Sequence, residues 1–232
     1  MIIRLLLLMT FVFMPWMAMA GNEGGRWFRS TVIDVDTGRA DAQVTTSWDA
    51  NLKIGDDVDK LAIRARGERK GSVTGRNEVQ LLWSRHLSHF WDVRAGYRRD
   101  FRPFARNEAV LAFTGLAPYF VETNLALYVG RAGQLRGEVE LAENLQLTQH
   151  LVAELYLDGE WHSFSESTQL MGAGLAQLNV GTRLRYEFNR HVALYADVFI
   201  EQAMGRSRSL QSAAGERTRL AGVRAGVRLF NF

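Results

Sequence analysis

Apolar and polar residues alternate along most of this chain with a period of two. The pattern is cleanest in residues 115–130, GLAPYFVETNLALYVG, where a tight-turn quartet leads into an alternating segment. One face of that segment is mainly apolar, with Val121, Thr123, Leu125, Leu127 and Val129. The other face is mixed, with Glu122, Asn124, Ala126, Tyr128 and Gly130. A period of two predicts a strand, and a length of about ten residues suits a tilted strand that crosses a bilayer.

The same alternation predicts twelve strands, of which the first is the least regular. They span residues 28–36, 43–53, 61–66, 78–83, 91–98, 108–114, 121–130, 135–141, 151–158, 178–187, 194–201 and 223–229. Connections after even-numbered strands are short, whereas those after odd-numbered strands are longer on average, notably residues 159–174 and 202–216. An even strand number with short periplasmic turns and longer outer loops is typical of bacterial outer-membrane barrels. Both ends of the chain are then expected in the periplasm.

The expected fold is all-β: a transmembrane, antiparallel, up-and-down β-barrel of about 12 strands over residues 28–232. A soluble β-sandwich also alternates its faces, but several segments exceed the roughly five or six residues of a usual strand. A closed barrel also satisfies every backbone hydrogen bond, which lipid requires. Charges on the polar faces would line the lumen, where we expect Asp92, Arg94, Arg98, Glu122, Glu138, Glu140, Arg183, Arg185 and Glu187. A narrow barrel filled by such side chains is expected to conduct poorly.

Aromatic residues support the same interpretation. Several lie near predicted strand ends, where interfacial girdles form: Trp48, Trp83, Trp91, Tyr97 and Tyr186. The chain ends in Phe232, and many bacterial barrels end in an aromatic residue. In a regular strand, Phe230 and Phe232 would lie on the same polar face as Arg224 and Arg228. We therefore expect either a bulge near Asn231 or an overhanging tail.

The first twenty residues, MIIRLLLLMTFVFMPWMAMA, have the pattern of a secretory signal peptide. Arg4 forms the positive region, an apolar core follows, and Ala18-Met19-Ala20 predicts cleavage after Ala20. Residues 21–27 form a short periplasmic lead before the barrel. The chain contains no cysteine, so an exported protein of this sequence forgoes disulfides. The net charge of only +3, together with export, argues against nucleic acid as a partner.

Several segments resemble one protein family in the same order along the chain. They are SRHLSHFWDVRAGYRRDF (84–101), AVLAFTGLAPYFVETNLALYVG (109–130), ENLQLTQHL (143–151), LNVGTRLRYEF (178–188) and AGVRAGVRLF (221–230). Together they identify the sequence as similar to the copper resistance protein B family over nearly all of the mature chain. The resemblance implies an outer-membrane barrel that acts in copper tolerance and binds copper ions or helps to move them across the outer envelope. It also implies no enzymatic reaction, and a partner among periplasmic copper oxidases.

The mature chain contains few soft ligands that could bind copper. Family members often carry a Met- and His-rich segment before the barrel, whereas GNEGGRW, residues 21–27, contains neither residue. Four histidines fall in short junctions at the expected periplasmic rim: His86, His89, His150 and His191. Their imidazole groups could bind copper with intermediate affinity. A second, looser set lies in the long outer loops: His162, Met171 and Met204. The alternative for each histidine is a polar turn residue without a ligand, and any copper is expected to bind weakly.

Two other functions are compatible with the barrel. A small-solute channel without metal chemistry would explain the scarcity of soft ligands. An outer-membrane lipase is suggested only by the neighbours His162 and Ser163, or Ser88 and His89. Adjacency in sequence does not make a catalytic pair, because the base must hold the nucleophile at hydrogen-bond distance. We therefore expect a protein that is not an enzyme.

Overall fold

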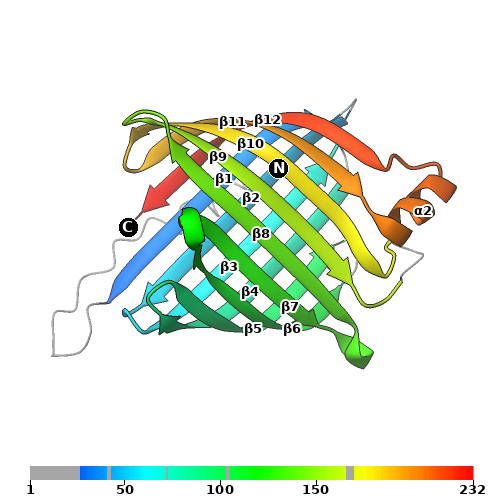
Figure 1. Cartoon of the computed structure of the whole chain (residues 1–232), viewed down its shortest axis with the longest axis horizontal. Helices are drawn as coiled ribbons and strands as arrows, with labels where there is room; N and C mark the ends of the chain where they lie inside the picture. Colours follow the sequence, from blue (N-terminus) through cyan, green and yellow to red (C-terminus); the bar gives the residue numbers. More distant parts are fainter. Residues whose placement is uncertain (1–26, 41–42, 72, 103–104, 166–169, 232) are drawn as a thin grey trace, which may run out of the picture.

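The twelve predicted strands close into one antiparallel barrel, which confirms the expected fold class (Figure 1). The computed structural model describes residues 27–40, 43–71, 73–102, 105–165 and 170–231. The predicted signal peptide, nearly all of the lead segment and Phe232 lie outside the described residues. The strands are β1 (Phe28–Ala40), β2 (Gln43–Gly55), β3 (Asp59–Lys70), β4 (Val73–Ser88), β5 (Trp91–Arg102), β6 (Arg106–Ala117), β7 (Val121–Val129), β8 (Leu135–Gln146), β9 (Leu151–His162), β10 (Gly174–Asn189), β11 (Val192–Ala203) and β12 (Arg219–Asn231).

Each strand pairs with its neighbours in the chain, and β1 closes the barrel against β12. That closing ladder runs from Thr31 opposite Asn231 to Ala40 opposite Gly222, without a register shift. A closed ladder leaves no strand edge, so the backbone groups are paired as a hydrocarbon environment requires. Among the described residues, no helix is long and apolar enough to cross a membrane.

The two faces of the strands differ as the alternation predicts. In β7, Leu125 and Leu127 are about two-fifths exposed on the outside, whereas Ala126 and Tyr128 are buried inside. The exposed side chains around the barrel are mostly large and apolar, and such a surface is stable in contact with lipid rather than water. The interior is filled mainly by charged and aromatic groups, together with one small apolar cluster of Ala62, Leu82, Val110, Ala112, Ala126 and Tyr128.

Glycines on the inner face make room for aromatic rings. A Cβ atom at Gly181 of β10 would lie 2.3 Å from the hydroxyl oxygen of Tyr156, and one at Gly226 of β12 would lie 2.5 Å from Cζ of Tyr195. Both distances are far shorter than any carbon contact in proteins. The rings of β9 and β11 therefore lie flat against the neighbouring strands because those positions have no side chain.

The strands are longer than their apolar alternation indicates. In the polar stretch 67–77, expected as a loop, residues 67–70 continue β3 and residues 73–77 begin β4, and the described residue between them, Gly71, has a positive φ. β1 likewise extends to Ala40 instead of ending at Asp36. The strands continue beyond the segments whose outward side chains are apolar, because the backbone hydrogen bonds between strands do not depend on which side chains face outward. The connection after β9 is correspondingly shorter than expected, at residues 163–173, whereas the connection after β11, at residues 204–218, has the expected length and begins two residues later than expected.

The two rims of the barrel differ in their connections. One rim has only short turns, at residues 56–58, 89–90, 118–120, 147–150 and 190–191, and the first residue of β1 and the last of β12 lie there. The opposite rim has the two long connections, and α2 (Gly205–Ala213) packs against β10 within the second (Figure 1). By the rule that short turns face the periplasm, the first is the inner rim and the second the outer rim.

At the end of the chain the structure excludes the bulge expected near Asn231, whereas the alternative, an overhanging tail, concerns Phe232 outside the described residues. β12 stays in register with β1 through Asn231, and Phe230 lies opposite Val32 with no bulge between them. The N–H of Phe230 also donates to the carbonyl oxygen of His191 at 2.8 Å. Phe230 therefore keeps the inward parity of Arg228, and the ladder itself holds the end of the strand.

Candidate functional site

A network of arginines and carboxylates crosses the lumen from one wall to the other. Arg66 on β3 donates to Glu78 on β4 at 2.9 Å and reaches Glu138 and Glu140 on β8, each at 2.9 Å. Four strands separate β3 from β8 along the wall, so these bonds span the interior. Arg76 on β4 similarly approaches Glu160 on β9 at 3.5 Å. The network crosses the lumen through groups that each have several partners.

Tyr128 lies at the centre of this network. Its hydroxyl donates to Glu138 at 2.6 Å, and the guanidinium groups of Arg98 and Arg136 each lie 4.7 Å from its ring centre. Arg98 is only 1% exposed and also pairs with Glu78. A ring held between two cations gains cation–π attraction, which is strongest where water is excluded.

A second network occupies the other half of the interior. Glu154 on β9 accepts from Arg183 and Arg185 on β10, both at 3.1 Å. Arg228 on β12 approaches the same carboxylate at 3.4 Å and pairs with Asp34 on β1 at 2.6 Å. These bonds connect β9, β10, β12 and β1, which belong to one continuous arc of the wall, so they tie this half of the barrel together from the inside.

The remaining predicted lumen charges lie nearer the inner rim. Asp92 contacts Lys60 at 3.5 Å and His86 at 3.0 Å. Glu122 accepts from Asn144, and Glu187 accepts from Arg185. Arg94 lines a small interior cavity with Asn51, and among the described residues neither Arg94 Nε nor Asn51 Oδ1 has a hydrogen-bond partner.

The four rim histidines do not form one cluster. His86 belongs to β4 rather than to the junction, which corrects the prediction, whereas His89, His150 and His191 lie in turns as expected. His150 Nδ1 lies 3.0 Å from the carbonyl oxygen of Glu187, and His191 Nδ1 lies 3.3 Å from that of Phe230. Within the described ranges, no three His, Cys, Asp or Glu side chains are grouped so that they could share a metal ion.

His162 is placed differently from the prediction. It is the last residue of β9 rather than a loop residue, and its Cα lies opposite those of Gly174 and Arg136. The side chain is 1% exposed, and neither ring nitrogen has a hydrogen-bond partner in the described part of the chain. Its Nε2 lies 3.8 Å from a carboxylate oxygen of Glu160. Buried polar atoms are nearly always paired, so an imidazole with both ring nitrogens buried and without a hydrogen bond is a candidate for ligand binding.

Met171 and Met204 lie in the two long outer connections, as predicted. Met204 precedes α2, and its N–H donates to the carbonyl oxygen of Ala176 at 2.9 Å. They share the outer end of the barrel with His162. Ser163, next to His162, accepts from the N–H of Leu135 at 2.9 Å. No bond between this serine and a histidine is found among the described residues.

Sequence reasoning missed several members of the lumen networks. Arg66 and Glu78 were visible on the polar faces but were not singled out, and the same holds for Glu108, Arg136 and Arg228. Strand parity could have identified each of them, because every one alternates with outward apolar residues. Parity does not show which charges meet, because partners lie on strands far apart in the sequence.

Solved structures with this architecture define the class of protein. The NanC porin aligns over 86% of this chain and 100% of its own, with a TM-score of 0.59 and 11% identity. The KdgM porin aligns over 87% and 99%, with a TM-score of 0.53 and 11% identity. At this identity the likeness shows the fold alone: the chain is an outer-membrane β-barrel.

The sequence comparisons place the chain in one family. The family described as "Copper resistance protein B precursor (CopB)" matches residues 31–231, and the chain belongs to it. Copper resistance protein B of Escherichia coli is 32% identical over 193 residues, which are 83% of this chain and 65% of that protein. The Copper resistance protein B homolog of Pseudomonas syringae pv. tomato (strain ATCC BAA-871 / DC3000) is 31% identical over 185 residues, 79% of this chain and 63% of its own. This chain thus spans slightly less than two thirds of the length of these relatives.

Proposed function

We propose that this barrel binds copper ions as part of copper resistance at the outer membrane and helps to move them across the outer envelope. Membership of the copper resistance protein B family carries this proposal. Copper is the cargo, held weakly, and a periplasmic copper oxidase is the partner that the family resemblance implies. We propose no enzymatic activity.

The outer mouth offers the best contact for copper. The ring nitrogens of the buried His162 have no hydrogen-bond partner among the described residues, and a carboxylate oxygen of Glu160 lies 3.8 Å from Nε2. Two ligand atoms that each lie about 2 Å from one ion can be up to about 4 Å apart. Imidazole is a good ligand for copper, and thioethers favour its reduced form. Met171 and Met204, on connections at the same end, are candidates to complete the set. Arg76 competes for Glu160 at 3.5 Å, which is consistent with weak binding.

The rim histidines are a separate hypothesis. His150 and His191 engage Nδ1 with backbone carbonyls, which leaves Nε2 as the only nitrogen for a metal. Their positions on different turns allow single contacts rather than a chelating site. We therefore assign His86, His89, His150 and His191 a lower affinity than His162.

Copper titration of the refolded barrel in detergent tests the proposal. His162→Ala is expected to weaken binding at least about tenfold, since it removes the one nitrogen ligand of the set. A variant with His86, His89, His150 and His191 all changed to Ala serves as the matched control and should keep its affinity. Loss of binding in the control with retention in His162→Ala would move the site to the inner rim. No binding by the unaltered barrel would refute copper binding by this chain.

The channel alternative is tested by conductance. Arg66 and its partners Glu138 and Glu140 span the lumen, so a barrel in this state should pass little current. Planar-bilayer recordings that show a stable, open, copper-independent pore would favour a small-solute channel instead. A deletion strain complemented with either the intact gene or the His162→Ala gene is then compared for growth in the presence of copper. This comparison shows whether the binding and conductance results matter for copper tolerance in the cell.

A further inference from the structure

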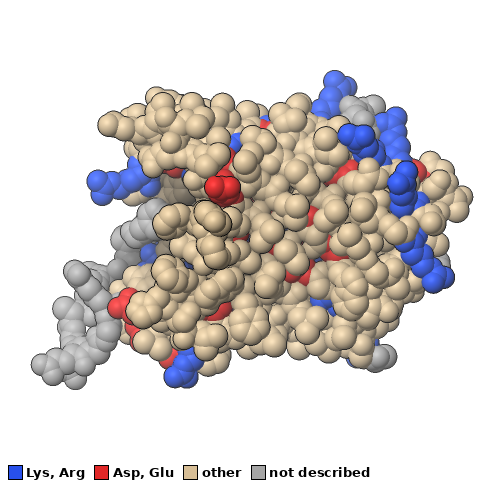
Figure 2. All heavy atoms as spheres, in the orientation of Figure 1, with Lys and Arg blue, Asp and Glu red and all other residues tan. Residues whose placement is uncertain are grey.

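The outer rim of the barrel is strongly basic. Its exposed arginines in the described chain are Arg39, Arg69, Arg99, Arg102, Arg131, Arg206, Arg208, Arg217 and Arg219. Figure 2 shows blue side chains gathered at this end, on the right of the view, with little red beside them. Glu216 is the one exposed carboxylate among the described residues of this rim, and the others are half-buried or buried. The inner rim, in contrast, carries both signs. The charge asymmetry suits an anionic surface on the outer side.

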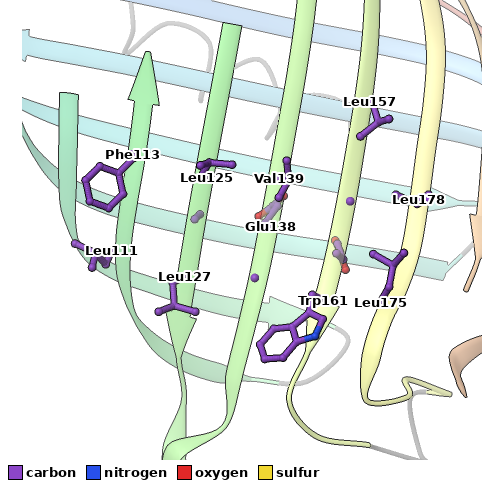
Figure 3. A pocket seen from close by; sticks show the side chains of 14 residues that line it. Leu111, Phe113, Leu125, Leu127, Glu138, Val139, Leu157, Trp161, Leu175 and Leu178 are labelled. Carbon is purple, nitrogen blue, oxygen red and sulfur yellow. The ribbon is translucent and has the colours of Figure 1, made fainter. Parts of the chain in front are cut away.

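An apolar hollow lies on the lipid-facing wall below this rim. It has a volume of about 460 Å³ and extends over β6 to β10, between Leu111, Phe113, Leu127, Leu157, Trp161 and Leu178 (Figure 3). Gly137 on β8 and Gly159 on β9 form its floor, because no side chain rises there between the rows of leucines. A Cβ atom at Gly137 would lie 3.6 Å from Trp161, an ordinary contact, so the backbone does not require glycine at this position.

Two cations stand above the outer end of the hollow. Arg131 follows Leu127 by four residues, and Arg99 lies opposite Asn107, which is four residues from Leu111 towards the outer rim. The extended chain from Leu111 to Asn107 spans roughly 13 Å, and Arg131 begins the 3-10 helix η3 (Arg131–Gly133) just after β7. No ion pair joins either arginine to a carboxylate of the described chain. We infer that this face binds a phosphate-bearing lipid of the outer leaflet, with the phosphate at Arg99 and Arg131 and an acyl chain along Gly137 and Gly159.

Charge favours lipid over a second copy of the chain. In a symmetric pair that meets at this hollow, the arginines of one rim would face those of the other. Like charges at such a contact oppose association. A phosphorylated lipid satisfies both features at once, since its headgroup neutralises the rim and its chain fills the apolar volume.

Native mass spectrometry of the detergent-folded barrel tests the inference, with lipid A as the probe and its dephosphorylated form as the comparison. We expect one tightly held lipid A per barrel. Arg99→Gln with Arg131→Gln should weaken its binding about 30-fold, because each arginine near an anionic lipid contributes roughly fivefold. Arg85→Gln with Arg190→Gln removes the same charge from exposed positions of the inner rim and should change binding little.

Gly137→Leu tests the apolar half separately. The substitution faces lipid and fills the hollow, so the barrel should fold normally, which its heat-modifiable gel mobility would verify, and bind lipid A at least about fivefold more weakly. Equal binding of phosphorylated and dephosphorylated lipid would overturn the inference. Equal losses in the inner-rim and outer-rim variants would also overturn it. A dimer that Gly137→Leu dissociates would show that the hollow receives protein instead.

Discussion

Arg66 is the side chain whose loss should most weaken the barrel. It donates to Glu78 at 2.9 Å, to Glu140 at 2.9 Å and to both oxygens of Glu138 at 2.9 and 3.2 Å. Arg66→Met keeps similar volume but removes all four bonds. Glu78 keeps Arg76 and Arg98 as partners, so the cost falls mainly on Glu138, which is 6% exposed.

The magnitude follows from what remains around Glu138. Tyr128 still donates to it at 2.6 Å, but the nearest guanidinium groups, of Arg76 and Arg98, are 3.8 and 3.9 Å away. Removing one partner of a buried ion pair typically costs about 3–5 kcal/mol. Because two cations remain nearby, we expect a loss near the lower end, about 3 kcal/mol in the free energy of unfolding.

Urea unfolding from lipid vesicles, followed by tryptophan fluorescence, measures this loss. Arg66→Met combined with Glu138→Gln should recover at least about half of it, since the neutral amide no longer needs a cation. Lys70→Met breaks the exposed pair with Glu68 and should cost at most about 1 kcal/mol. A loss for Arg66→Met no larger than that of Lys70→Met would refute the reasoning, and so would strict additivity in the double variant.

Two further predictions concern packing and a turn. Gly181→Ala should displace the Tyr156 ring and destabilise the barrel by about 1–3 kcal/mol in the same unfolding assay; an unchanged midpoint would contradict the close approach of that ring. Asp56 accepts the N–H groups of Asp59 and Val58 at 2.7 and 2.9 Å, and these backbone hydrogen bonds lower the pKa of its carboxyl group. A lowered folded-state pKa stabilises the turn above the usual carboxyl pKa, and this contribution is lost as pH falls through the lowered value. Carboxyl NMR titration should show the shift, and Asp56→Asn should abolish the corresponding acid dependence of hydrogen exchange at Asp59; a titration at the ordinary carboxyl pKa would contradict the turn geometry.

Alternation along the chain was sufficient to predict the strands, their number and their faces. Leu125 and Tyr128 were assigned to opposite faces from parity alone, and the structure agrees, because a strand has no other way to place successive side chains. The resemblance to the copper resistance protein B family was likewise visible in short motifs. Those two sources together supplied the fold and the family.

Alternation was less informative at the ends of strands. Residues 67–77 are mostly polar and were expected to form a loop, yet residues 67–70 extend β3 and residues 73–77 extend β4. His86 and His162 were assigned to connections for the same reason and belong to strands. Hydrophobic pattern reports the environment of a side chain, whereas strand length is set by backbone pairing with the neighbouring strand.

The sequence by itself determined that arginines and carboxylates line the interior, because along each strand they alternate with the apolar residues that face outward. Only the tertiary structure decided that Arg66 meets Glu138 across the lumen, that the buried His162 has no hydrogen-bond partner among the described residues, and that Gly137 and Gly159 leave a hollow in the lipid face. Each of these depends on strands brought together by barrel closure. The period of a strand assigns a side chain to a face, but the register and curvature of the closed sheet determine what that side chain meets.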